Sequence, residues 1–255
     1  MKVSLITVSF NSVKTIEQTI NSVLSQNYEN IEYIVIDGSS CDGTQEILKK
    51  YEEKLDILII EKDKGIYDAM NKGIRLSSGE IIGIINSDDF YHDNNVINEV
   101  VEKVKKNPEC DVFLSDIFFI NKKNMISRRI YAKYFKPWKL RFGWMPPHPG
   151  IFLKKNIINE IGLYDISYMI ASDFEYCLRL FFRKSVKFYY LNLYSVVMRE
   201  GGLSTKGFRS DYIISKEMIR SLKTNKIYSN TFFVYSRLPI KFMLKIFYLI
   251  QRRKN

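Results

Sequence analysis

The sequence predicts an α/β fold in which helices flank a mostly parallel sheet. Four short apolar runs, at residues 3–8, 33–36, 55–60 and 81–85, each end in a polar or acidic cluster. Nearly continuous β-branched runs of this length, separated by helical patterns, are typical of buried parallel strands. Ligands bind beside the carboxyl ends of such strands, so we expect the acidic clusters to meet at one edge of the sheet.

Helical patterns follow each of these runs, and a further strand closes the first half of the chain. After Ser12 or Thr15, the residues Ile16, Ile20 and Val23 recur on one helical face. The other elements expected in this half are helices from residue 44, over 66–77 and over 95–106, and a strand over 111–116.

The second half is less regular. Residues 118–155 are aromatic, basic and rich in proline, which predicts a mixed subregion that covers the edge of the sheet. This subregion ends in a strand over 151–153. A helix is then expected from Ser172, with Asp173 in its first turn, and a last helix over about 237–253.

The composition indicates a globular protein of a reducing compartment. With 255 residues the chain is one large domain, or a domain with an appendage, and no apolar stretch reaches the roughly 18 residues of a membrane span. Its three cysteines are isolated and odd in number, and no signal-peptide pattern follows Met1. We therefore expect a cytoplasmic protein.

The net charge of +11 is unevenly distributed. No acidic residue follows Glu217, whereas that tail holds nine Lys and Arg residues, and an acid-free stretch over 117–159 holds ten more. An acidic cleft beside basic surfaces suits a metal-bound anionic ligand and a second anionic partner, such as a lipid phosphate or a membrane. We expect no nucleic-acid partner.

Two strand-end motifs carry the chemistry. Asp88 and Asp89 come directly after a buried strand, where two carboxylates can hold Mg²⁺ or Mn²⁺ together with a diphosphate. The alternative is that they cap the next helix or solvate a turn. Asp37 begins a turn with two glycines, where it could accept a hydrogen bond from a nucleobase, or simply shape the turn.

Taken in order, the motifs resemble the family 2 glycosyltransferases. The resemblance covers about residues 3–205 and is specific for the family but poor for the substrate. The segments that carry it are Val8-Ser9-Phe10-Asn11, Asp37-Gly38-Ser39-Ser40, Asp63 to Gly73, Asn86-Ser87-Asp88-Asp89, Ala171 to Glu175 and Gly201-Gly202-Leu203-Ser204. The run from Asp63 to Asn71 resembles the corresponding motif in the branch of the family that makes bacterial surface polysaccharides.

This resemblance implies the GT-A fold, whose mostly parallel sheet is Rossmann-like and flanked by helices. It implies a catalytic domain over 1–215, with a nucleotide-sugar half at 1–116 and a mixed acceptor-side half at 117–215. Residues 216–255 would then form a basic amphipathic helical segment. A homo-oligomer is compatible with these features.

The resemblance also assigns roles to single residues. Asp37 would read the base of the nucleotide with Phe10 beside the ring, Asp88 would meet the ribose side, and Asp89, with Asp88, would hold the metal on the diphosphate. Ser87 replaces the first Asp of the usual D-x-D motif. The other residues expected at the nucleotide are Val8, Asn11, Gly65, Asp68 and Asn71.

Asp173 matches the family's general base, and His148 and Glu175 are the expected acceptor contacts. A carboxylate near the acceptor hydroxyl takes its proton while the sugar carbon is attacked from the opposite face, which inverts the anomeric centre. We expect the helix dipole to favour the ionised form of Asp173 and so to make it a weaker base. His148 is equally compatible with a structural role.

The predicted function is therefore a metal-dependent, inverting transfer of a sugar from a nucleoside diphosphate, with UDP favoured, to a glycan hydroxyl on a lipid-linked acceptor. Two alternatives are a sugar nucleotidyltransferase and a noncatalytic carbohydrate- or membrane-binding module. A nucleotidyltransferase would need a Gly-rich basic loop after the first strand, where this chain has Phe10-Asn11-Ser12.

The segment over about 237–253 also has two interpretations. Its apolar residues and its basic residues, which include Lys241, Lys245, Arg252 and Arg253, alternate closely, which favours a peripheral helix on the anionic inner face of the cell membrane. Alternatively, the same apolar residues pack against the catalytic domain.

Overall fold

The sheet is mixed, with its parallel part at the N-terminal side. The computed structural model describes residues 1–184, 186–201 and 208–252, without the side chains of 208–209, 241–242 and 244–252. In this part of the chain, nine strands form one sheet in the order β3-β2-β1-β4-β8-β6-β9-β5, with β7 beside β6. The strands are β1 (Val3–Ser9), β2 (Ile31–Asp37), β3 (Ile57–Ile60), β4 (Ile81–Asn86), β5 (Phe90–Tyr91), β6 (Val112–Ile120), β7 (Ile126–Ile130), β8 (Ile151–Lys154) and β9 (Phe188–Arg199).

The four predicted strands of the first ninety residues are β1 to β4, and they pair in parallel. Farther along, β8 is antiparallel to both β4 and β6, and β9 is parallel to β6. The predicted α/β class is confirmed. The helices of eight or more residues are α1 (Ile16–Leu24), α2 (Thr44–Tyr51), α3 (Ile66–Leu76), α4 (Val96–Lys106), α7 (Phe208–Thr224) and α8 (Thr231–Arg252), and the shorter ones used below are α5 (Lys155–Ile161) and α6 (Ser172–Leu178).

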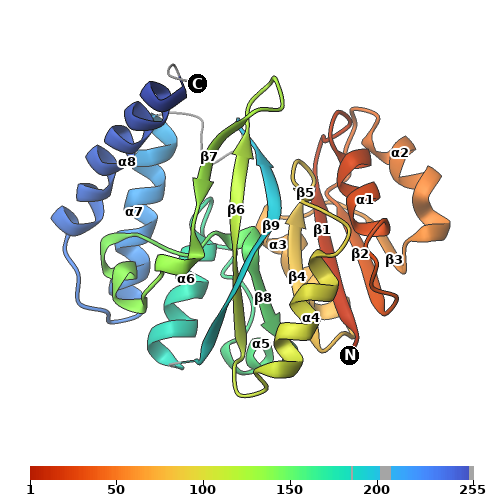
Figure 1. The fold of residues 1–255 in the computed structure, drawn as a ribbon, viewed down its shortest axis with the longest axis horizontal. Coiled ribbons are helices and arrows are strands. Elements are labelled where there is room, and N and C mark those ends of the chain that lie inside the picture. Colours follow the sequence, from red (N-terminus) through yellow and green to blue (C-terminus); the bar gives the residue numbers. More distant parts are fainter. Residues whose placement is uncertain (185, 202–207, 253–255) are drawn as a thin grey trace.

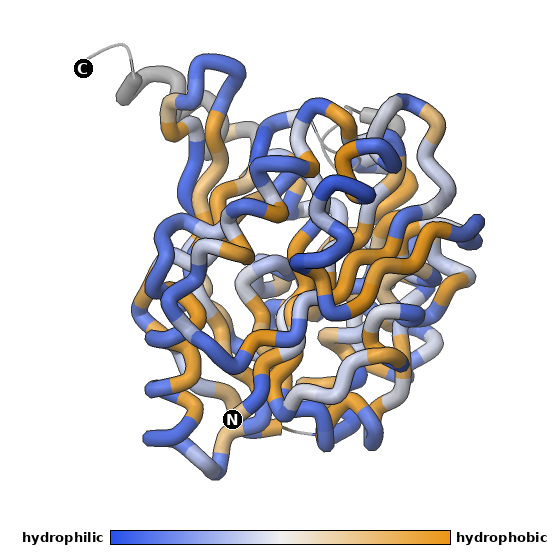
Figure 2. Tube along the Cα trace, turned by 90° about the vertical axis from the view of Figure 1, so that its right-hand side faces the viewer, coloured by the Kyte–Doolittle hydropathy of each residue, from blue (hydrophilic) through white to orange (hydrophobic). Residues whose placement is uncertain are grey.

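Alternation along the strands divides the core into two layers. In β1, Leu5 belongs to the layer under α1, α2 and α4, whereas Ile6 and Val8 belong to the layer with α3, α5 and α6. Successive side chains of a strand point to opposite faces, so each strand serves both layers. Figures 1 and 2 show the result, in which apolar strands run through the interior and hydrophilic segments form the connections.

The C-terminal helices pack on the rest of the chain. Ile214, Met218 and Leu222 of α7 and Val234 of α8 join the same core layer as α6. The predicted division between residues 215 and 216 falls inside α7.

Helix α8 starts at Thr231, six residues before the predicted start, and lies against α7 at the left of Figure 1. No described helix is long and apolar enough to span a bilayer. Gly202, Leu203 and Ser204 of the last motif lie outside the described residues.

Candidate active site

Three neighbouring parallel strands bring the expected donor-side residues to one edge of the sheet. Ser9 at the end of β1 lies opposite Asp37 at the end of β2, and Val8 lies opposite Asn86 at the end of β4. In Figure 1, β1 and β4 run upward, so this edge is the upper one. Asp37 and the acidic pair at 88–89 therefore flank the end of β1.

Hydrogen bonds to Asp37 hold the loop after β2. Its buried carboxylate accepts from the N–H (2.8 Å) and the hydroxyl (2.6 Å) of Ser40. Asn11 fastens this loop to the end of β1, because its N–H donates to Ser40 Oγ (2.7 Å) and its Oδ1 accepts from the Cys41 N–H (3.0 Å). Asn11 therefore shapes the loop around Asp37, whose side chain is fully buried.

Phe10 forms the open side of this corner. Its ring is 63% exposed, and a Cβ added to Gly38 would lie 3.2 Å from the ring and 2.5 Å from Asp63 Oδ2. Only glycine at position 38 leaves room for the side chains of both Phe10 and Asp63. An exposed ring beside a polar loop is a stacking platform for a planar heterocycle. Val8 is buried beneath, and its carbonyl accepts from the Ser87 N–H (3.2 Å).

The acidic pair after β4 lacks the partners that buried carboxylates need. Asp89 is 1% exposed, and its Oδ1 has no hydrogen-bond partner, whereas Oδ2 accepts weakly from Asn86 Nδ2 (3.3 Å). Burial and the neighbouring Asp88 raise the pKa of Asp89, and burial raises the pKa of Asp88. Arg199 of β9 donates to the Asp88 carbonyl (2.7 Å) and holds this turn in place.

These residues fit a divalent cation. Asn86 Oδ1 and Ser9 Oγ, at the same edge, are also buried without a partner, so two further orphaned oxygens accompany Asp89 Oδ1. Hard cations such as Mg²⁺ and Mn²⁺ prefer oxygen ligands. Among the described residues, no group of three or more His, Cys, Asp or Glu side chains is arranged to hold a metal ion, so a diphosphate would have to complete the metal's coordination.

Of the other residues predicted at the nucleotide, Gly65 directly precedes α3, and Asp68 and Asn71 lie on it. Gly65 has φ +112° and open space where a Cβ would stand, and Asp68 Oδ2 accepts from the Lys64 N–H (3.0 Å). Asn71 is different. It is 2% exposed, and its amide exchanges two hydrogen bonds with the backbone of Tyr164, at 2.8 and 2.9 Å. Asn71 therefore joins α3 to the acceptor-side half rather than to a nucleotide.

Asp173 lies in the first turn of α6, as predicted, but its electrostatics differ from the prediction. Burial raises its pKa to about 6, against the lowering effect of the Phe174 N–H at 2.7 Å and with a further raising effect from Glu217. The expected weakening by the helix dipole was wrong, because α6 has only seven residues and desolvation of the carboxylate outweighs it. Asp173 is thus largely ionised at pH 7 and a stronger base than an exposed aspartate.

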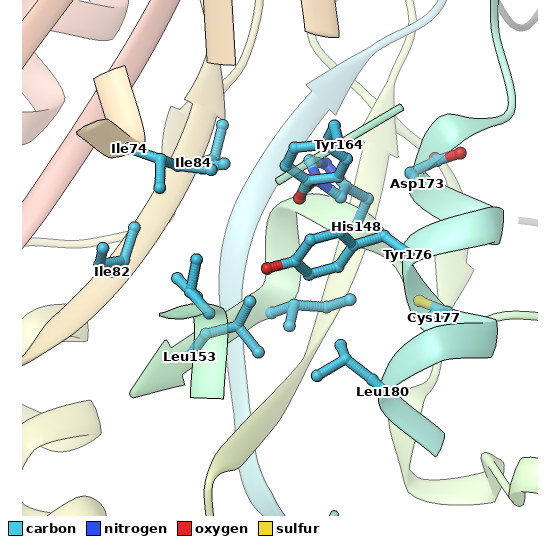
Figure 3. Close-up of a pocket in the computed structure, with 12 residues that line it drawn as sticks. Ile74, Ile82, Ile84, His148, Leu153, Tyr164, Asp173, Tyr176, Cys177 and Leu180 are labelled. Atoms are coloured by element: carbon cyan, nitrogen blue, oxygen red, sulfur yellow. Dashed lines mark hydrogen bonds between the residues drawn. The ribbon is translucent and has the colours of Figure 1, made fainter. Parts of the chain in front are cut away.

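His148 and Asp173 are among the residues that line a small cavity of about 20 Å³ beside α6, and Figure 3 shows the Asp173 carboxylate pointing away from His148 and Tyr164. His148 Nε2 and the Tyr164 hydroxyl are 2.8 Å apart, and burial lowers the pKa of His148 to about 4, so the imidazole is neutral. Tyr176, which stacks on Tyr164 with ring centroids 4.4 Å apart, has a buried hydroxyl without a partner. The cavity has room for about one water molecule.

Glu175, the other expected acceptor contact, faces away from this site. Its buried carboxylate accepts two bonds from Arg179 Nε (3.0 and 2.9 Å) and one from Asn225 Nδ2 (3.2 Å). Arg179 also donates to the carbonyl of Leu163 (2.7 Å). The pair joins α6, the end of α7 and the preceding loop, so the carboxylate of Glu175 is engaged in holding these segments together.

Sequence reasoning missed the residues that connect the two halves of the site. The Tyr67 hydroxyl, from α3, donates to the Ile170 carbonyl and lies beside the Asp173 carboxylate. Glu217 of α7 binds the same segment from the other side. Tyr67 stood inside the resembling motif and could have been singled out, whereas no sequence signal connects Glu217 to a loop 47 residues earlier.

Comparisons with known proteins identify the family of this chain. The model of the family "Glycosyl transferase family 2" matches residues 4–188. An uncharacterized glycosyltransferase of Mycobacterium tuberculosis is 33% identical over 180 residues, which cover 69% of this chain and 68% of the relative. A protein of Escherichia coli named UDP-Glc:alpha-D-GlcNAc-diphosphoundecaprenol beta-1,3-glucosyltransferase WfaP is 28% identical over 225 residues, covering 86% and 83%.

Solved structures show the same fold. TarS 1-349 of Staphylococcus aureus in complex with UDP-GlcNAc has a TM-score of 0.66 at 18% identity, with 91% of this chain and 75% of that chain covered. The mannosyltransferase PcManGT of Pyrobaculum calidifontis, in complex with GDP-Man and Mn²⁺, has a TM-score of 0.62 at 15% identity, covering 91% and 66%. This chain spans 39% of a longer TarS chain. With its family match and these relatives, the chain belongs to glycosyl transferase family 2 and is a glycosyltransferase.

Proposed function

We propose that this glycosyltransferase moves a sugar from a nucleoside diphosphate to a glycan hydroxyl, with inversion, and that a divalent cation assists. The observation that carries the proposal is the arrangement of three acidic sites. Asp37 and the Asp88–Asp89 pair flank the end of β1, and Asp173 lies on α6 beside Tyr67, which comes from the nucleotide-side half.

The donor would lie along the carboxyl edge of the sheet. The nucleobase would stack on Phe10 near Asp37, and Asp88 and Asp89 would hold the metal and the diphosphate. The metal would neutralise the charge that develops on the leaving diphosphate. UDP is the favoured nucleotide because the WfaP relative is named for UDP-Glc and TarS binds UDP-GlcNAc.

Asp173 would be the general base. With its pKa of about 6 it is mostly ionised at neutral pH, and its carboxylate can take the proton of the acceptor hydroxyl. The acceptor would be a lipid-diphosphate-linked glycan of bacterial surface-polysaccharide or glycolipid synthesis. This assignment is supported by the names of the WfaP relative and of a mycobacterial "PGL/p-HBAD biosynthesis glycosyltransferase", which is 24% identical over 223 residues.

We further propose a peripheral contact with the anionic inner face of the cell membrane. The start of α8 packs on the protein, since Val234 is fully buried, but Phe232, Ile240 and Met243 are exposed. The side chains of Lys241 and Lys245 lie outside the described residues, so this proposal rests on the sequence of the distal half of α8. Basic residues near such a surface contribute about 1 kcal/mol each.

The test is a panel of UDP-Glc, UDP-GlcNAc and GDP-Man with a soluble GlcNAc-diphosphate-lipid analogue. Release of free nucleoside diphosphate is measured with Mn²⁺ and with EDTA, and NMR of the product gives the anomeric configuration. The proposal expects metal-dependent release, an inverted product and almost no turnover by Asp173→Asn. A retained configuration, or full turnover by Asp173→Asn, would contradict it.

A further inference from the structure

We infer that Glu217 is a positioning residue that holds the segment leading into the general base Asp173, from outside the part of the chain that matches the family. This inference rests on the proposed role of Asp173. The family match ends at residue 188, whereas Glu217 lies in the middle of α7. Nothing in the family motifs of this chain assigns a role to α7.

The Glu217 carboxylate accepts hydrogen bonds from three consecutive backbone N–H groups. Glu217 Oε1 accepts from the N–H of Met169 (2.7 Å), and its Oε2 accepts from the N–H groups of Ile170 (2.9 Å) and Ala171 (2.9 Å). These residues directly precede α6, which begins at Ser172. Successive N–H groups that converge on one point form an anion-binding concavity, and here the chain supplies the anion itself.

A second side chain of α7 also binds the segment before α6. Arg220, one turn after Glu217, donates to the Ser167 hydroxyl (2.7 Å) and carbonyl (3.2 Å), and its guanidinium lies 4.4 Å from the centre of the Tyr168 ring. From the opposite side, the Tyr67 hydroxyl donates to the Ile170 carbonyl. Helices α3 and α7 therefore hold the five residues before α6, and through them the position of Asp173.

Charge adds a second effect. The groups that act electrostatically on Asp173 or respond to it are Tyr67 of α3, Tyr164 of the preceding loop, Cys177 of α6 and Glu217 of α7. Of these, Glu217 is the carboxylate, and its coulombic effect raises the pKa of Asp173. A like charge disfavours ionisation, so Glu217 keeps the pKa of Asp173 higher and makes it a better proton acceptor.

The test compares pH profiles of donor hydrolysis, in which water replaces the acceptor. The probe is whichever of UDP-Glc, UDP-GlcNAc and GDP-Man the enzyme cleaves fastest with Mn²⁺. In the wild type, kcat should rise with pH through about 6 as Asp173 ionises. Glu217→Gln removes the charge and one acceptor oxygen. We expect the acidic limb to move to lower pH by about half a unit, the scale of one unit charge in partly buried protein.

We also expect Glu217→Gln to lower kcat at pH 8 by about 10-fold or more with an unchanged donor KM, since misplacing a reacting group by about 1 Å can cost about 100-fold. Glu217→Asp keeps the charge but has a shorter side chain, so it should lower kcat without moving the acidic limb of the pH profile. Lys216→Gln, a charge change at the exposed neighbouring residue, should behave as wild type.

The outcomes separate this inference from the proposed function. If Asp173→Asn is inactive but Glu217→Gln matches Lys216→Gln in both kcat and pH limb, the role of Glu217 is rejected and the general base stands. A uniform loss of activity with a lower melting temperature and no shift of the limb would reduce Glu217 to a structural residue. If Glu217→Gln does not fold, the Glu217→Asp variant is the test, because an unchanged kcat in that variant would also contradict the positioning role of Glu217.

Discussion

Replacing Asp89 should stabilise the metal-free protein and abolish its response to metal. Asp89 is 1% exposed and its Oδ1 has no partner, so the folded protein contains a carboxylate that is poorly solvated and faces the like charge of Asp88. In Asp89→Asn the side chain keeps its size and loses its charge. Its new amide group can also donate to Asn86 Oδ1, which is itself unpaired.

The size of the effect follows from these two unpaired oxygens. A buried polar group without a partner costs about 1–3 kcal/mol. Taking about 2 kcal/mol, and about 2–4 °C per kcal/mol for a chain of this size, we expect Asp89→Asn to raise the melting temperature in EDTA by about 4–8 °C. For the wild type, Mn²⁺ and UDP at about 100 times their dissociation constant should contribute about 2.7 kcal/mol, or about 5–11 °C.

The assay is thermal unfolding in EDTA, in Mn²⁺, and in Mn²⁺ with UDP. Asp89→Asn should start higher and show no rise with Mn²⁺ and UDP. Glu53→Gln, a charge removal at an exposed site, is the matched control and should follow the wild type. A melting temperature of Asp89→Asn below that of the wild type in EDTA, together with an intact rise on adding Mn²⁺ and UDP, would refute the reasoning.

Three further predictions concern the base and the C-terminal helices. Asp173→Asn should keep donor affinity in calorimetry and lose about 10²- to 10⁴-fold in kcat, and a lost donor affinity would move Asp173 to the donor site. Val234→Ala, at a fully buried position of α8, should lower the free energy of unfolding by about 1–2 kcal/mol in urea, whereas Phe232→Ala, at a side chain 77% exposed, should leave it unchanged. A chain ending at Ile240 should stay folded, because Val234 and Arg237 remain, but should lose co-sedimentation with anionic vesicles at low salt. Equal sedimentation of the short and full chains would contradict the membrane contact.

The sequence alone determined the four parallel strands at the N-terminal side of the sheet and the acidic edge where they end. β1 to β4 were readable because a buried parallel strand is a short apolar run, and this signal depends only on neighbouring residues. The edge that carries Asp37 and Asp89 followed, since parallel strands end on the same side. Asp173 was found by its motif and its place at a helix start.

Side-chain partners that are distant in sequence were not readable in this way. Asn71 and Glu175 stood in family-like motifs, yet their polar atoms are taken up by Tyr164 and by Arg179 with Asn225. A motif specifies a residue type at a position, whereas the partner of its side chain depends on which elements pack against it.

Tertiary structure alone also decided the sign of the Asp173 pKa and the role of the C-terminal helices. The sequence shows a first-turn acid and so predicts a lowered pKa, but the enclosure of that carboxylate by α3, α6 and α7 raises it. Likewise, the closely alternating basic and apolar residues of the tail favour a membrane helix over a packed one. The burial of Val234 shows that α8 begins as a packed helix, because burial depends on the partner surface and not on the helix's own pattern.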